Sequence, residues 1–116
     1  MLRYCNQHYD LIVREELPRP GSWVAVPVPG RKQRFAYLAK VDSIMGQTVH
    51  LHYVSRPINP KTTFYSFPDC QDEDSVPILD LCKMPAPVDS EMGRRYGFEW
   101  RATDLQKALD VLNISF

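Results

Sequence analysis

The sequence lacks net charge, because its 14 basic residues balance its 14 acidic residues. This balance argues against a protein that coats nucleic acid or an anionic membrane with its whole surface. The sequence also lacks a long hydrophobic run, and no segment approaches the roughly 20 apolar residues that a membrane helix needs. We therefore expect no membrane partner, and binding through a local part of the surface.

Cysteine is scarce: Cys5, Cys70 and Cys82 are an odd number of thiols with no close pair. They do not form a disulfide framework, and the polar start "MLRYCNQHYDLIVREEL" is not a signal peptide, so we expect a reducing compartment. His-x-His on one strand with two thiols would suit zinc. The candidate thiols, Cys70 and Cys82, do not form a Cys-x-x-Cys knuckle, so we expect no metal.

Motifs that mark common catalytic sites are missing as well. The chain has no Gly-x-Ser-x-Gly, no phosphate-binding loop and no His-Glu-x-x-His. The enzyme alternative is Cys70 acting with a histidine, which no local motif supports. We therefore expect a non-catalytic protein that carries no cofactor.

What the sequence has is a series of short apolar segments separated by turn residues. Its 116 residues, 44% of them hydrophobic, fit one domain with one core. Val49, Leu51 and Tyr53 alternate with two histidines, which is the period of a strand with one buried face. Pro27 has no amide hydrogen, so its strand must lie at an edge or end there. The predicted strands are 23–28, 35–44, 48–56, 62–67 and 96–100.

Other segments have different patterns. The acidic stretch 69–74 and the segment 85–95 are predicted as loops, and 76–84 as a helical turn or a strand. The sequence "TDLQ" at Thr103 has the form of a capping box, which predicts a C-terminal helix that Asn113 can end. Residues 9–17 fit a short helix or an edge strand.

Short strands with tight connections predict an antiparallel sheet, and a small sheet removes its edges best by closing on itself. We therefore predict a mostly β fold: an antiparallel SH3-like barrel with additional strands and one C-terminal helix. The predicted division is an N-terminal extension at 1–20, the barrel at 21–101 and the helix at 102–116.

Three segments, "SWVAVPV", "FAYLAKVDSI" and "TVHLHYVSR", resemble the strands of Tudor-like chromatin modules. The later segments "FYSFPDCQDEDSVPILDLCKMPAP" and "RRYGFEW" resemble the end of such modules. A weaker resemblance links "YLAKVDSIMGQTVHLHYVSRPINP" and "ILDLC" to bromo-adjacent homology domains, although His52 stands nearest the place of their usual Trp. Both resemblances imply a nuclear, chromatin-associated protein.

The Tudor-like resemblance implies a binding module for a methylated histone tail or a similar peptide. Such modules hold the methylated cation among aromatic rings, through cation–π attraction and desolvation. Tyr37 and Tyr53 also share the parity of apolar neighbours, so the alternative is that both are core residues. The matching candidates are Phe35, Tyr37, Tyr53, Phe64, Tyr65 and Phe67, with Asp69 or Asp72 as the acid.

A basic loop contains Arg31, Lys32 and Arg34. It is either a solvated hairpin tip or a contact for phosphate or an acidic partner, so a nucleic-acid contact through 31–34 remains an alternative function. A further alternative is an interaction or dimerisation scaffold that uses the edge at Pro27 or the C-terminal helix and has no pocket for a modified peptide.

Overall fold

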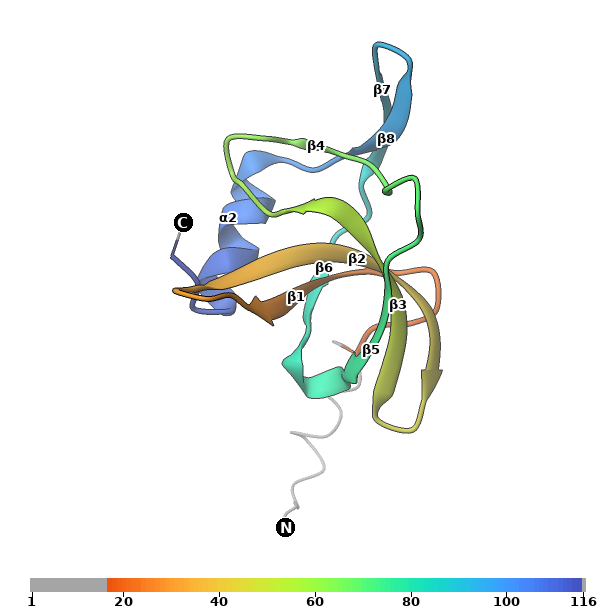
Figure 1. Ribbon diagram of the computed structural model, residues 1–116, viewed down its shortest axis with the longest axis vertical. Coiled ribbons are helices and arrows are strands. Elements are labelled where there is room, and N and C mark those ends of the chain that lie inside the picture. Colours follow the sequence, from red (N-terminus) through yellow and green to blue (C-terminus); the bar gives the residue numbers. More distant parts are fainter. Residues whose placement is uncertain (1–16, 116) are drawn as a thin grey trace.

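The computed structural model describes residues 17–115, which form a mostly β protein with one C-terminal helix (Figure 1). The segment predicted at 9–17 lies, apart from Leu17, outside the described residues. In chain order the elements are β1 (Trp23–Pro29), β2 (Arg34–Met45), β3 (Thr48–Pro57), β4 (Phe64–Tyr65), β5 (Glu73–Pro77), the 3₁₀ helix η1 (Ile78–Asp80), β6 (Cys82–Met84), β7 (Val88–Met92), β8 (Arg95–Glu99) and α2 (Ala102–Val111).

The larger sheet is antiparallel, with strand order β5-β3-β2-β1-β6. Its two edge strands, β5 and β6, follow one another in sequence and are joined through η1. They are not paired with each other, so the sheet is not closed into a barrel. Both edge strands are short, and β5 ends at Pro77, whose nitrogen has no hydrogen to donate to a further strand.

The strands predicted at 35–44 and 48–56 are confirmed as β2 and β3. Gly46 makes the turn between them at φ 61°, a conformation that costs glycine little. Pro27 lies where β1 pairs only with β2, because β6 pairs with Trp23, Val24 and Ala25 alone. The prediction of an edge at Pro27 is therefore right for that end of the strand, while the other end is interior.

A second, smaller sheet has the order β4-β8-β7. The prediction of a loop over 85–95 is wrong, because Val88–Met92 is a strand that forms a hairpin with β8. Its residues are mostly exposed, so no apolar alternation marked it. The predicted strand 62–67 shortens to β4, and the predicted loop 69–74 ends early because β5 begins at Glu73. The 76–84 segment contains both predicted structures, η1 and β6.

The larger sheet buries side chains on both faces, and alternate residues of each strand serve the two faces. One face packs with α2 and the smaller sheet; its cluster includes Trp23, Leu38, Val54 and Leu109. Residues of the η1 segment lie against the opposite face. That second cluster contains Val24, Val26, Ala39, Val41, Val49, Leu51 and Tyr53.

The N-cap of helix α2 lies two residues before the predicted cap, Thr103. Arg101 is the N-cap residue, because its carbonyl accepts from the amides of Asp104 and Leu105. Its side chain makes no capping hydrogen bond. Thr103 therefore lies inside the first turn, and the capping-box prediction is wrong. At the other end Asn113 adopts φ 58°, and the Ile114 amide donates to the Leu109 carbonyl, which together form a Schellman ending.

Within residues 17–115, no helix is both long enough and apolar enough to cross a membrane.

Candidate functional site

A cavity of about 360 Å³ opens where β3 separates from β5. The last paired residues of the two strands are His52 and Glu73. The chain that leads into β5 makes one wall of the cavity. The cavity is lined by His52, Tyr53, Phe67, Pro68, Gln71 and Asp72.

Phe67 is the exposed aromatic wall of this cavity. Its ring is 40% exposed, which is unusual for phenylalanine. It stacks on Trp23, with ring centroids 5.8 Å apart, and meets the edge of Phe98 at 5.5 Å. These two buried or half-buried rings fix the orientation of Phe67, so one of its faces is supported by the core.

Tyr53 is the second aromatic residue of the cavity, and it is also part of the core. Only 7% of it is exposed, and Tyr37 packs against its ring edge-on at 5.8 Å. Its hydroxyl donates to the Asp74 carboxylate at 3.0 Å. Burial, and then this hydrogen bond, raise the pKa of the Tyr53 hydroxyl well above its ordinary value. The residue is therefore neutral and held in place at physiological pH.

The charge around the cavity favours a cation. The carbonyl of Asp72 accepts the Tyr53 amide at 2.8 Å, which fixes the acidic residue beside the aromatic pair. Among the described residues that line the cavity, none is Lys or Arg. A carboxylate beside two aromatic rings can bind a weakly hydrated cation through charge and cation–π attraction together.

A smaller cavity of about 210 Å³ adjoins the first, because Phe67 and Pro68 line both. Its other walls include Asp69, Arg95 and Tyr96, of which Tyr96 is 80% exposed. The two cavities make a continuous surface from β3 to the turn end of the β7–β8 hairpin.

The structure thus brings Tyr53, Phe67 and Asp72 together, with Asp69 in the adjoining cavity. The remaining predicted aromatic residues do not line either cavity. Phe35 packs near Gly30 at the β1–β2 hairpin, and Tyr37 lies behind Tyr53.

Phe64 and Tyr65 are buried in the core. The Tyr65 hydroxyl accepts from the Asn59 amide and donates to the Asn59 carbonyl. This hydroxyl is therefore engaged within the protein, and the buried ring does not face a ligand. Burial raises the pKa of this hydroxyl as well.

Sequence reasoning did not assign His52, Pro68 or Gln71 to the aromatic site. His52 points out of a strand whose next residue, Tyr53, points in, so strand periodicity alone separates them. His52 and Tyr53 nevertheless border one cavity, because β5 separates from β3 at this point. Pro68 and Gln71 lie in a segment with no periodic signal.

The predicted basic loop is divided by the fold. Arg31 and Lys32 are exposed at the β1–β2 hairpin. Arg34 instead donates to the Leu112 carbonyl at 3.3 Å, at the C-terminal end of α2, where a cation is favourable. Arg34 therefore has a structural partner, which leaves Arg31 and Lys32 for a phosphate or an acidic partner.

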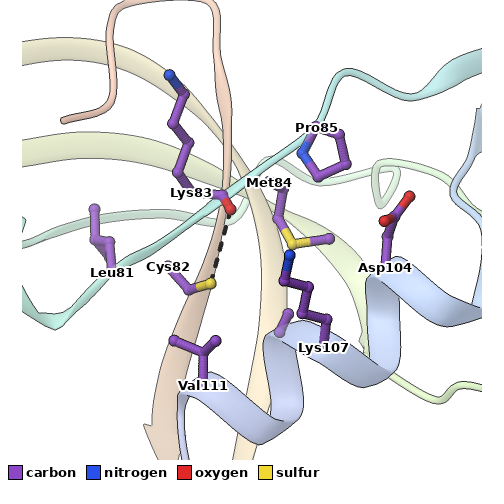
Figure 2. A pocket seen from close by; sticks show the side chains of 9 residues that line it. Leu81, Cys82, Lys83, Met84, Pro85, Asp104, Lys107 and Val111 are labelled. Carbon is purple, nitrogen blue, oxygen red and sulfur yellow. Dashed lines mark hydrogen bonds between the residues drawn. The ribbon is translucent and has the colours of Figure 1, made fainter. Parts of the chain in front are cut away.

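A larger cavity, of about 630 Å³, lies between β6 and α2 (Figure 2). Lys83 and Lys107 stand at its sides, and the half-buried Cys82 faces it. Burial raises the pKa of the Cys82 thiol, so this cysteine is not activated as a nucleophile. The cavity has no aromatic ring in its lining.

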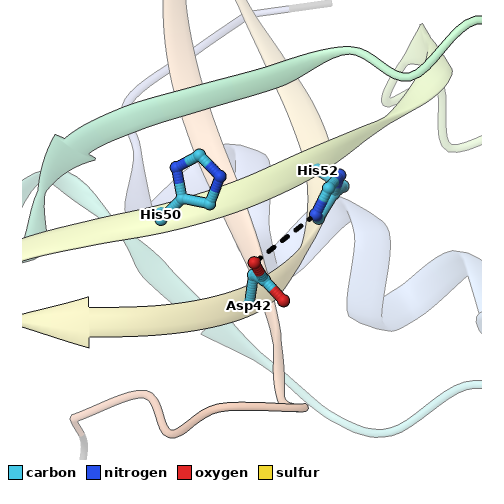
Figure 3. A group of neighbouring side chains, drawn as sticks. All are labelled: Asp42, His50 and His52. Atoms are coloured by element: carbon cyan, nitrogen blue, oxygen red, sulfur yellow. Dashed lines mark ion pairs between the residues drawn. The ribbon is translucent and has the colours of Figure 1, made fainter.

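The two strand histidines do not meet the thiols. His50 and His52 lie side by side on β3 with Asp42 of β2 beside them (Figure 3), whereas Cys82 pairs with Ala25 on β1. The zinc arrangement considered from sequence, two histidines with two cysteines, therefore does not form.

Comparisons of this chain with protein-family models, with curated proteins and with solved structures found no match.

Proposed function

We propose that this protein is a non-catalytic binding module that holds a methylated lysine or arginine side chain in the cavity between Tyr53 and Phe67. One observation carries the proposal: two aromatic side chains and a carboxylate, from β3 and from the segment between β4 and β5, line one open cavity without Lys or Arg. Asp72 supplies the carboxylate. The arrangement matches the chemistry of a methylated ammonium ion, which has few hydrogen-bond donors and is readily desolvated.

The fold supports the same proposal. The order β5-β3-β2-β1-β6, with η1 between the edge strands, is compatible with an open variant of the SH3-like barrel of Tudor-like modules. The face carrying Val24, Leu51 and Tyr53 takes the place of the barrel interior in this proposal. The candidate cavity then lies at one end of the sheet, where the cation site of such a module is expected.

A peptide rather than a free small molecule is the proposed ligand. The adjoining cavity gives a second contact within reach of the same extended chain, with Tyr96 for apolar groups and Arg95 for an acidic group. A histone tail is the first peptide class to examine, and a nuclear, chromatin-associated role follows from the proposal.

The test is a titration of trimethyl-lysine histone peptides and their unmodified twins, followed by fluorescence polarisation. Phe67→Leu removes the ring while keeping an apolar side chain of similar size. Loss of one cation–π contact of about 0.5–2 kcal/mol predicts methylated-peptide binding weaker by about 2- to 30-fold. Binding of the unmodified peptide should change much less.

Phe35→Leu is the matched control, because it is the same substitution at a half-buried ring outside the cavity. It should leave peptide affinity unchanged. If no methylated peptide binds better than its unmodified twin, the proposal is wrong. Light scattering of the same protein examines the scaffold alternative by measuring its oligomeric state. A duplex-DNA titration of the wild type and Arg31→Glu examines the nucleic-acid alternative.

A further inference from the structure

We infer that Asp42, His50 and His52 form a surface site for a borderline divalent metal ion of the zinc class. One ligand atom from each of the three residues lies within 4.8 Å of the other two. Figure 3 shows the three side chains on one side of the β2–β3 pair. The site goes beyond the proposed peptide binding and does not depend on it.

The backbone brings these three side chains together for two reasons. His50 and His52 are two positions apart on β3, so both leave the same face, with ring centroids 5.9 Å apart. On β2 the register shifts between Val41 and Ser43, and Asp42 is the extra residue. Such a bulge re-aims a side chain, and here the carboxylate lies 3.8 Å from Nε2 of His52.

The distances suit an ion after small side-chain rotations. Ligands at about 2.0–2.1 Å from a tetrahedral ion are roughly 3.3 Å apart. Asp42 is exposed, and the two histidines are half-buried, so the necessary rotations move no core residue. Three protein ligands leave a fourth position open to water or to another ligand.

Partners on β5 already hold one of the histidines. His50 Nε2 lies 2.8 Å from Oε1 of Glu73, and its Nδ1 lies 3.2 Å from Oγ of Ser75. Metal-bound histidine normally donates its other ring N–H to such a group, which fixes the ring. Whichever nitrogen of His50 takes the ion, the other retains a partner.

The donor set and the charge select the ion. Two imidazoles and one carboxylate suit zinc and its first-row neighbours, whereas calcium and magnesium prefer oxygen ligands alone. Asp42 and Glu73 supply two negative charges. A positive charge on the neighbouring strand is Lys40, which pairs with His52. Its ammonium lies over the Trp23 ring, 6.0 Å from the ring centroid.

The experiment is a calorimetric titration of the full chain with Zn²⁺ alone, joined to NMR of the histidine rings. We expect one ion per chain and shifted ring signals of His50 and His52. Loss of a ligand in His52→Ala or Asp42→Asn should weaken binding at least as much as loss of an outer partner, about 10- to 100-fold. Glu73→Gln should fall in that outer-partner range.

The triple variant Cys5→Ser/Cys70→Ser/Cys82→Ser is the control for thiol binding and should keep the wild-type affinity. Asp42 does not line the aromatic cavity, so Asp42→Asn separates this site from peptide binding. No binding at equimolar Zn²⁺, or binding unchanged by both His52→Ala and Asp42→Asn, overturns the inference. Binding lost only in the cysteine variant overturns it as well.

Discussion

Replacing Tyr53 with phenylalanine tests whether the wall of the cavity is built as the structure shows. Tyr53→Phe keeps the buried ring and removes only the hydroxyl that donates to Asp74 at 3.0 Å. A hydrogen bond to a charged group contributes about 1.5–3 kcal/mol, but the Asp74 carboxylate is exposed to solvent. We therefore expect the variant to lose about 1 kcal/mol of unfolding free energy at pH 7.

The same substitution should change how stability depends on alkaline pH. The folded pKa of Tyr53 is raised above the ordinary 10.0 of the unfolded chain, so above pH 10 only the unfolded state has lost this proton. The unfolded state then binds fewer protons, and stability falls as pH rises, by about 1.4 kcal/mol per pH unit. Tyr53→Phe has no such loss. The Tyr65 hydroxyl, whose pKa is also raised, lowers the stability of both proteins equally at alkaline pH.

The measurement is urea unfolding of both proteins from pH 7 to pH 11. The wild type should be more stable by about 1 kcal/mol up to pH 9, and the two curves should cross between pH 10 and pH 11, because about 1.4 kcal/mol is lost by pH 11. Tyr96→Phe, at an 80% exposed ring, is the control and should change stability at pH 7 by less than about 0.5 kcal/mol. Parallel curves for wild type and Tyr53→Phe would refute the reasoning.

Two further substitutions test the backbone at other places in the fold, after α2 and in β8. Asn113→Ala should lower thermal stability by about 1 kcal/mol, because an alanine β-carbon disfavours the left-handed φ of 58°, whereas Asn113→Gly should not; equal melting temperatures for the two would contradict this. Gly97→Ala would place a β-carbon 2.6 Å from Cζ of the buried Phe64, so urea unfolding should show a loss of about 2 kcal/mol or more of unfolding free energy. An unchanged midpoint would show that β4 is not held against β8 as described.

The long meander could be predicted from sequence because periodicity and turn chemistry agree there. Val49, Leu51 and Tyr53 alternate with histidines, and Gly46 makes the turn in the conformation that glycine favours. The end of α2 was equally readable, since asparagine tolerates the left-handed backbone at Asn113. In both places the local signal and the tertiary structure require the same residue.

The strand β7 of the small sheet could not be predicted, because its stability comes from pairing rather than from an apolar face, whereas β8 lies within one residue of the strand predicted at 96–100. Val88–Met92 exposes most of its side chains and is a strand because Arg95–Glu99 lies beside it. The start of α2 was misread because its N-cap residue has no capping side chain. Arg101 caps the helix through its backbone alone, since its carbonyl accepts from the amides of Asp104 and Leu105.

The aromatic site was only partly predictable, since exposure separates a ligand-facing ring from a core ring and sequence does not report exposure. Phe64 and Phe67 are three residues apart and chemically identical, yet 5% of one and 40% of the other is exposed. Phe64, in β4, packs against Gly97 of β8, while Phe67 stacks on Trp23 with one side open.

The point where β5 separates from β3 determines what both proposed sites can bind, because residues from opposite faces of β3 border one cavity there. Up to His52 the strand is paired on both sides, and its alternate residues are segregated into core and surface. Where β5 departs, Tyr53 and His52 border the same cavity. An ion held by His52 and Asp42 would place positive charge beside a cavity proposed to take a cation, so saturating Zn²⁺ should weaken methylated-peptide binding in the wild type and not in Asp42→Asn.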